Sequence, residues 1–80
     1  MITLRIRTFA ELKQYMGDIY EIKIPDYTTG RDVKDKLKDF HPEIMDLIDD
    51  CRFIANDTYL PDQEYITQEE IFLMPPTSGM

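Results

Sequence analysis

The stretch T-G-R-D-V-K-D-K-L-K-D-F, residues 29–40, predicts the one substantial helix of the chain. Thr29 is placed to accept a hydrogen bond from a free backbone N–H at the helix start. Asp32 stands three positions later, where its carboxylate can accept one from the capping residue. His41-Pro42 ends the helix, because proline lacks a backbone donor and disfavours helical geometry in the residue before it.

The two sides of this helix differ in polarity. Its apolar face, at spacings of four and three residues, consists of Val33, Leu37 and Phe40. We expect this face to pack on a sheet, because side chains at such spacings lie above one another on a helix. The other side is expected to be solvated and consists of Lys34, Asp35, Lys36 and Lys38.

Two alternating segments precede the helix and predict two strands. Residues 2–7 and residues 20–24 each place every second side chain on an apolar face, as in a half-buried strand. Residues 9–16 between them contain good helix formers and are followed by Gly17, so we expect a short helical segment there. The two strands are predicted to pair as an antiparallel ribbon.

Shorter elements follow the main helix. Pro42 opens a short helix that extends to residue 48, since proline is favoured in a first helical turn. Residues 52–55 and 58–60 predict two strands joined by a turn at residues 56–57. Residues 71–74, I-F-L-M, predict a last strand that is apolar on both faces.

This order of elements predicts an α+β fold of the β-grasp, or ubiquitin-like, type: a mixed sheet of four to five strands curled over one main helix plus short helices. The first and last strands are expected side by side at the centre, and a parallel pair needs the helical crossover that the chain supplies. The inward side chains are then Ile2, Leu4, Ile6, Ile22, Ile24, Val33, Leu37, Phe53, Ala55, Ile71 and Leu73. The outward side chains are Arg5, Arg7, Ile54, Phe72 and Met74.

The last strand runs directly into Pro75 and Pro76, which cannot donate to a sheet ladder. The chain is therefore predicted to divide into a β-grasp domain, residues 1–76, and a flexible C-terminal tail, residues 77–80. Such a tail is either an ordinary frayed end or a slim end that is inserted into a partner.

Length and charge restrict the function. Eighty residues provide one small core and no room for a deep active-site cleft. The net charge of −7 argues against a nucleic-acid partner. No cation follows Arg52, and the acidic last third of the chain is either a solvated surface or a docking surface for a basic partner.

No catalytic or metal-binding motif is found in the body of the chain. Cys51 and His41 are the single cysteine and histidine, and neither has a partner at the spacing of a nucleophilic or metal site. We expect Cys51 to be a buried, inert thiol. The chain has no signal-peptide layout and no apolar run near the roughly 20 residues of a bilayer span, so a cytoplasmic protein without membrane contact is predicted.

Three segments carry a resemblance to a known family: H-P-E-I after the capped helix (residues 41–44), F-I-A-N-D-T-Y-L (residues 53–60) and E-E-I-F-L-M-P-P-T-S-G (residues 69–79). They are similar to the aromatic-Pro-Glu turn, the VAVNxxxV stretch and the DEVxxxPPVSG ending of the MoaD/ThiS ubiquitin-like sulfur carriers. The resemblance covers essentially the whole chain. The double proline favours MoaD, the small subunit of molybdopterin synthase, over ThiS.

The resemblance implies a protein that is not an enzyme by itself but a small subunit or protein co-substrate of a sulfurtransferase such as molybdopterin synthase, in molybdenum cofactor biosynthesis. Its terminal carboxylate would be adenylated by an ATP-dependent MoeB/ThiF-like enzyme, converted to a thiocarboxylate and inserted into a MoaE-like large subunit. The carrier would bind no cofactor, and no residue of its body would be catalytic. The sulfur-carrying end would be Gly79-Met80, and the inserted tail Pro75, Pro76, Thr77 and Ser78.

One position departs from the family pattern. Members end in Gly-Gly, whereas this chain has Gly79-Met80. Glycines suit passage through a narrow channel, and methionine adds bulk there. The alternatives are a β-grasp interaction module that no longer conjugates and a precursor that needs C-terminal processing. The sulfur acceptor, whether pterin, thiazole or tRNA, stays open.

The outward apolar side chains predict a docking surface. Phe72 and Met74 are expected beside Ile54, because the last strand can bury only one of its faces. A partner that covers them would explain their exposure, with Arg5 and Arg7 at the rim to set its orientation. A neighbouring loop or a second copy of the chain is the alternative cover.

Overall fold

The computed structural model describes residues 1–76, and in them the main helix forms where the sequence predicts it. This helix is α2 (Gly30–Phe40). The Thr29 hydroxyl accepts a hydrogen bond of 3.2 Å from the backbone N–H of Asp32, and the Asp32 carboxylate accepts one of 3.1 Å from the backbone N–H of Thr29. The capping box satisfies two backbone donors at the start of the helix.

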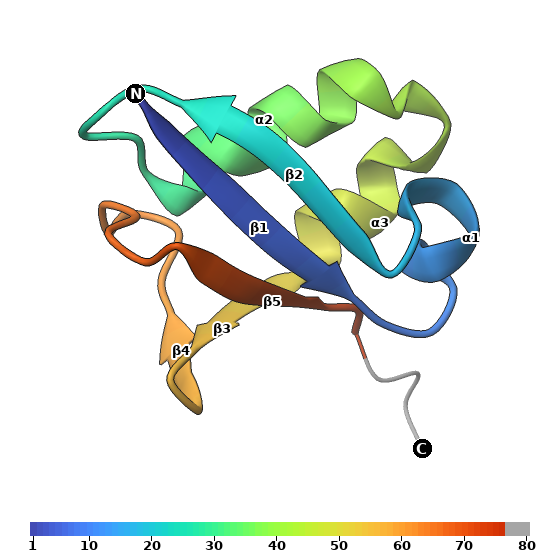
Figure 1. Cartoon of the computed structure of the whole chain (residues 1–80). Helices are drawn as coiled ribbons and strands as arrows, with labels where there is room; N and C mark the ends of the chain where they lie inside the picture. Colours follow the sequence, from blue (N-terminus) through green and yellow to red (C-terminus); the bar gives the residue numbers. More distant parts are fainter. Residues whose placement is uncertain (77–80) are drawn as a thin grey trace.

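Five strands form one mixed sheet in the order β2-β1-β5-β3-β4. They are β1 (Ile2–Thr8), β2 (Ile19–Ile24), β3 (Arg52–Ala55), β4 (Thr58–Leu60) and β5 (Glu70–Met74). β1 and β2 pair antiparallel, whereas β1 and β5, the first and last strands, pair in parallel at the centre (Figure 1). The predicted mixed sheet and its central pair are confirmed.

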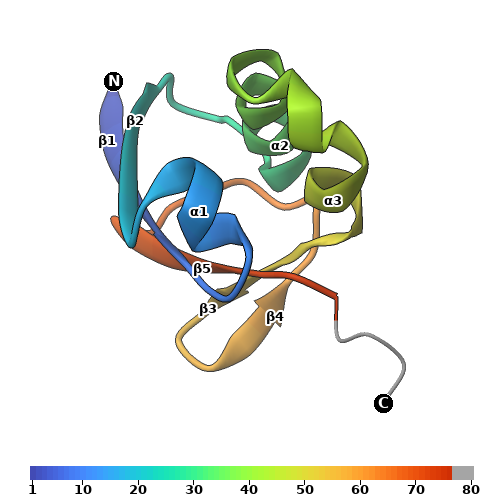
Figure 2. The ribbon, with the colours of Figure 1, turned by 90° about the vertical axis from the view of Figure 1, so that its right-hand side faces the viewer.

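The helices lie on one side of the sheet. Besides α2 they are α1 (Leu12–Met16), the 3-10 helix η1 (Pro42–Ile44) and α3 (Met45–Asp50). Figure 2 shows the sheet curved around α1, α2 and α3, which leave its other face open. This arrangement is the predicted α+β fold. Within residues 1–76, no helix has the length and hydrophobicity to cross a membrane.

The core lies between the sheet and the helices. Its buried side chains include ten that the strand and helix patterns predict, namely Leu4, Ile6, Ile22, Ile24, Val33, Leu37, Phe53, Ala55, Ile71 and Leu73. Ile2, also predicted to face inward, is partly buried against them. Further apolar side chains complete the core, namely Leu12, Met16, Ile44, Ile48, Leu60 and Ile66. Full burial of one such large side chain stabilises the fold by about 1.5–3 kcal/mol.

The first helix is shorter than predicted. It begins at Leu12 and not at residue 9, because Ala10 has a φ of 53°, in the left-handed region that a right-handed helix does not contain. Phe9 therefore precedes the helix, and its ring contacts the ring of Phe72 on β5. The two residues lie far apart in the sequence, so local periodicity carries no sign of this contact.

Two side chains of α2 also differ from the prediction. Phe40 is 57% exposed, although it shares the helical spacing of Val33 and Leu37. It is the last residue of the helix, and side chains of η1 and α3 close the core at that end. Lys34, predicted to be solvated, is only 3% exposed.

Lys34 is buried because it has two partners outside its helix. Its Nζ donates hydrogen bonds of 2.6 Å to the backbone carbonyl of Cys51 and 3.1 Å to the carboxylate of Asp62. It also lies 5.8 Å from the centroid of the Phe53 ring. Buried charges persist in proteins when they are paired and hydrogen-bonded. This lysine therefore joins α2 to the start of β3 and to the segment after β4.

Replacement of Asp62 by alanine is expected to lower the free energy of unfolding by about 2 kcal/mol, because it removes one of the two partners of a buried ammonium. Urea denaturation followed by circular dichroism measures the change. Asp39→Ala is the matched control, since Asp39 is an exposed residue of α2 that joins none of the ion pairs of residues 1–76. Its effect should stay within about 0.5 kcal/mol. Equal losses in the two variants would contradict the role of Lys34.

Candidate functional site

The open face of the sheet carries the predicted docking residues. The register places Phe72 of β5 between Arg7 of β1 and Ile54 of β3. Met74 lies two residues further along β5 and so points to the same face, where it is 38% exposed. Ile54, Phe72 and Met74 are therefore neighbours on one face, and together they are called the apolar patch below.

Phe9 closes one side of the apolar patch. Its ring centroid lies 5.7 Å from that of Phe72 at an interplanar angle of 69°, the edge-to-face arrangement that aromatic pairs favour. Phe72 itself is half-buried, so this contact covers part of its ring. A hollow beside the two rings is also lined by Arg7 and Lys13. Phe9 was missed by the sequence analysis, which placed it in a helix.

The other side of the apolar patch reaches the end of β5. A hollow there is lined by Asp50, Arg52, Ile54, Met74, Pro75 and Pro76. Arg52 is the partner of Met74 in the strand register, and its guanidinium lies 5.6 Å from the centroid of the Tyr59 ring. The alternation of β3 puts Arg52 on the same face as Ile54, so this residue could have been found from the sequence.

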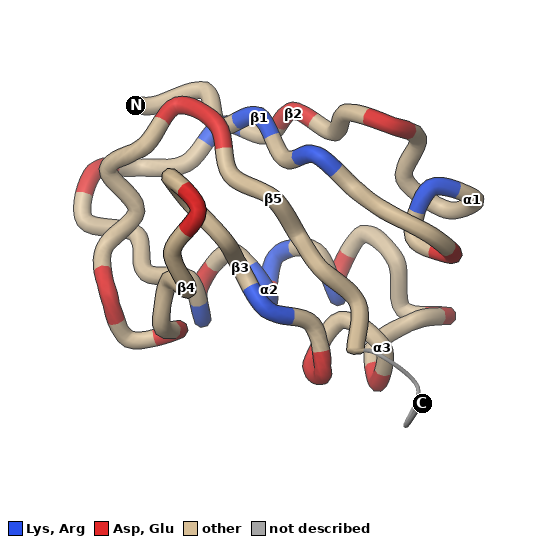
Figure 3. The backbone as a smooth tube through the Cα atoms, turned by 90° about the horizontal axis from the view of Figure 1, so that it is seen from below, with Lys and Arg blue, Asp and Glu red and all other residues tan. Residues whose placement is uncertain are grey.

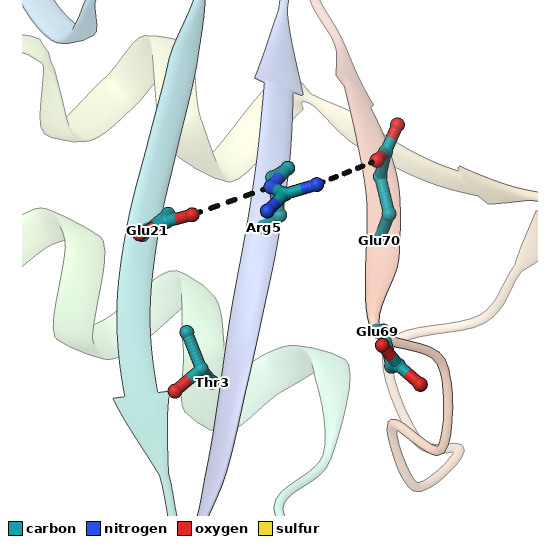
Figure 4. A pocket seen from close by; sticks show the side chains of 5 residues that line it. All are labelled: Thr3, Arg5, Glu21, Glu69 and Glu70. Atoms are coloured by element: carbon teal, nitrogen blue, oxygen red, sulfur yellow. Dashed lines mark hydrogen bonds and ion pairs between the residues drawn. The ribbon is translucent and has the colours of Figure 1, made fainter.

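The two arginines that were predicted to rim the patch are bound by carboxylates of their own sheet. Arg5 lies between Glu21 of β2, with Nε 3.3 Å from Oε2, and Glu70 of β5, with Nη1 3.7 Å from Oε1 (Figure 4). The Nε of Arg7 lies 2.5 Å from the Oε2 of Glu70. The hydrogen bond from Arg7, assisted by the charges of Arg7 and Arg5, lowers the pKa of Glu70 below the 4.5 of a free glutamate.

These ion pairs make the rim of the patch mixed in charge rather than purely basic. Glu21, Glu69 and Glu70 line one hollow together with Arg5. Solvent screens exposed ion pairs such as these, so they add little stability, and their main effect is to hold the side chains in place. A role of Arg5 and Arg7 in orienting a partner stays a prediction.

Most of the residues predicted to carry the chemistry belong to the part of the chain that the structure does not describe. Pro75 is half-buried and Pro76 is exposed directly after β5. The predicted flexible tail and sulfur-carrying end, Thr77, Ser78, Gly79 and Met80, fall outside the described residues. The division into a domain and a tail at residue 76 therefore stays a prediction.

The thiol of Cys51 is a core group. It is buried, and its Sγ donates a hydrogen bond of 3.1 Å to the backbone carbonyl of Leu47. Burial raises its pKa to about 11, so the thiol is protonated at neutral pH. This position confirms the prediction of a buried thiol. In the described part of the chain, no three His, Cys, Asp or Glu residues are grouped so as to hold a metal ion.

Comparison with known proteins finds similarity in structure. No family model and no curated protein matches the sequence. The putative molybdopterin converting factor subunit 1 from Pyrococcus furiosus superposes with a TM-score of 0.82 at 22% identity, over 96% of this chain and 100% of that chain. Two structures of small archaeal modifier protein 1 from Haloferax volcanii are also similar. One superposes with a TM-score of 0.76 at 22% identity, over 98% of this chain and 99% of that chain. The other superposes with a TM-score of 0.78 at 21% identity, over 96% of this chain and 100% of that chain. These matches confirm the predicted β-grasp fold.

The pKa of Glu70, measured by NMR from its side-chain carboxyl shift, is expected below 4.5 and should return toward that value in Arg7→Ala. Arg5→Ala should have a smaller effect, because its contact is longer. The stabilisation linked to this lowered pKa is complete above pH 4.5 and is lost as the pH falls through the folded-state pKa. Lys13→Ala is the control, since Lys13 pairs with Asp18 instead. An unchanged pKa in Arg7→Ala would contradict the ion pair.

Proposed function

We propose that this chain is a MoaD-like sulfur carrier whose C-terminal segment, residues 77–80, is activated and inserted into a partner enzyme for sulfur transfer in molybdopterin biosynthesis. The observation that carries the proposal is the apolar patch, which continues along β5 to Pro75 and Pro76. The structural likeness to a putative molybdopterin converting factor subunit supports it. A cytoplasmic location belongs to the same proposal, because the activating step consumes ATP.

The apolar patch is suited to a protein partner. Phenylalanine and methionine on an open sheet face lose hydration when a partner covers them, and aromatic residues and methionine are enriched in protein interfaces. The edge contact with Phe9 would restrict the Phe72 ring before binding, which would reduce the entropy lost on association. The charged rim of Arg5, Arg7 and Glu70 would restrict the orientation of the partner.

In this proposal the body of the domain docks and the terminal carboxylate reacts. A MoeB/ThiF-like partner joins the carboxylate to the α-phosphate of ATP and releases pyrophosphate. A sulfur nucleophile then displaces AMP and leaves a thiocarboxylate, which a MoaE-like large subunit receives. The chain supplies no base, metal or nucleophile, which agrees with the protonated, buried state of Cys51. It is not an enzyme by itself and binds no cofactor, since the ATP is held by the partner.

One residue favours a second function. Met80 stands where the resemblance implies glycine, and it favours a β-grasp interaction module that docks without conjugation, or a precursor whose end is processed. Both alternatives keep the apolar patch as the docking surface. Pterin, thiazole and tRNA are the candidate sulfur acceptors. Two structural neighbours are called small archaeal modifier proteins, so another protein, to which the activated terminus would be joined, is a further candidate acceptor.

ATP–pyrophosphate exchange with a MoeB/ThiF-like enzyme tests the docking surface. Phe72→Ala should weaken the complex by about 2 kcal/mol, seen as a roughly thirtyfold rise in the half-saturating carrier concentration. The unfolding midpoint should change little, because Phe72 is only half-buried. Tyr15→Ala is the control, since Tyr15 is exposed on α1, on the other side of the sheet. An unchanged half-saturating concentration in Phe72→Ala would remove the patch from the docking surface.

Replacement of Met80 by glycine tests the terminus. The exchange rate at saturation should rise, because a smaller last residue passes a narrow channel more easily, while the half-saturating concentration stays the same. Intact mass of the product should show one O-to-S exchange when a sulfur donor is present. Absence of exchange with both wild type and Met80→Gly would contradict the carrier function and favour the interaction module.

A further inference from the structure

A pair of exposed tyrosines lies at the end of the molecule away from Pro75 and Pro76. Tyr27, in the loop between β2 and α2, is 81% exposed, and Tyr65, in the segment between β4 and β5, is 57% exposed. Their ring centroids are 5.8 Å apart at an interplanar angle of 78°. Figure 1 shows the two loops side by side where β2 ends and β5 begins. We call this pair the tyrosine site.

Backbone hydrogen bonds join the two loops under the rings. The carbonyl of Thr28 accepts a bond of 2.7 Å from the N–H of Ile66, and the N–H of Gly30 donates one of 3.1 Å to the carbonyl of Glu64. Ile66 is buried in the core directly after the exposed Tyr65. The two rings therefore project from loops that are hydrogen-bonded to each other and anchored to the core by Ile66.

The backbone of Tyr27 has a conformation that stability alone does not favour. Its φ of 65° lies in the left-handed region, where a residue with a bulky side chain is disfavoured and glycine is not. The ring recovers little free energy by burial, because most of it faces water. Residues held in such sparsely populated backbone conformations cluster at ligand-binding and catalytic sites, which makes the exposed Tyr27 a candidate for binding.

The surroundings of the pair suit a cation. Asp26 precedes Tyr27 and Glu64 precedes Tyr65, and among residues 1–76 neither acid joins an ion pair. Figure 3 shows acidic segments at this end of the tube. Tyr59, another exposed tyrosine, already holds the guanidinium of Arg52 at 5.6 Å from its ring centroid. Within the described chain, no cation lies over either ring of the tyrosine site.

We propose that the tyrosine site binds an arginine side chain from an extended basic segment of a partner protein. The faces of tyrosine rings attract a guanidinium, whose planar shape allows it to stack on a ring, and the negative charges of the adjacent residues Asp26 and Glu64 add to this attraction. The site is separate from the apolar patch. The proposal therefore goes beyond sulfur transfer and does not depend on it.

NMR titration of the full chain with the peptide acetyl-Gly-Arg-Gly-Arg-Gly-amide tests this proposal. Amide shifts of residues 26–28 and 64–66 should saturate, and the matched peptide with citrulline in place of arginine should bind much more weakly, because it has the same shape without the charge. Tyr27→Gly should weaken binding about threefold, and Tyr27→Gly combined with Tyr65→Ser about tenfold. Tyr59→Ala, the matched control, should bind as the wild type does.

The stability of Tyr27→Gly separates binding from folding. Its melting temperature should equal or exceed that of the wild type, because glycine relieves the left-handed strain. A lower melting temperature would give Tyr27 a folding role and overturn the proposal. The proposal would also be overturned if the citrulline peptide bound as tightly as the arginine peptide, or if the double variant bound the arginine peptide as the wild type does. Sedimentation that shows a dimer lost in Tyr27→Gly would assign the site to a second copy of the chain and also overturn it.

Discussion

The parallel pairing of β1 with β5 is the interaction on which the rest of the structure depends. It joins the first strand to the last, and parallel neighbours need a crossover, which the chain makes through α2. The pairing also buries Ile71 and Leu73 under the helices and turns Phe72 and Met74 to the open face. The apolar patch is thus a direct consequence of placing a strand that is apolar on both faces at the centre of a sheet with one covered face.

Local patterns predicted the elements and most of the core. The strands follow from alternation of period two, and the start of α2 follows from Thr29 and Asp32, which lie three residues apart. Local patterns failed where distant residues decide the environment. Lys34 is buried because Asp62 and the Cys51 carbonyl bind it, and Phe9 leaves its expected helix to contact Phe72. The periodicity of a single segment reveals neither the partners of Lys34 nor the contact between Phe9 and Phe72.

The candidate site likewise has features that local patterns predict and features that depend on distant residues. The apolar patch could be predicted, because alternation alone selects its members. The ion pairs of Arg5 and Arg7 could not be predicted, because they depend on the register of three strands. A slip of one residue in that register would turn these side chains to the other face of the sheet. The arginines are predicted to meet a partner as parts of ion pairs, so their contribution should fall with salt and bear on orientation more than on affinity.

The two candidate surfaces lie toward opposite ends of β5. The strand begins after the segment that carries Tyr65 and ends at Met74, directly before Pro75, and its five residues span about 17 Å at the usual rise of a strand. An arginine bound at the tyrosine site would therefore not block the end at which the strand runs into the prolines. A partner that reaches both surfaces would gain from the second contact through effective concentration, without any change in the fold. Binding at one end can then strengthen binding at the other simply because both contacts belong to the same partner.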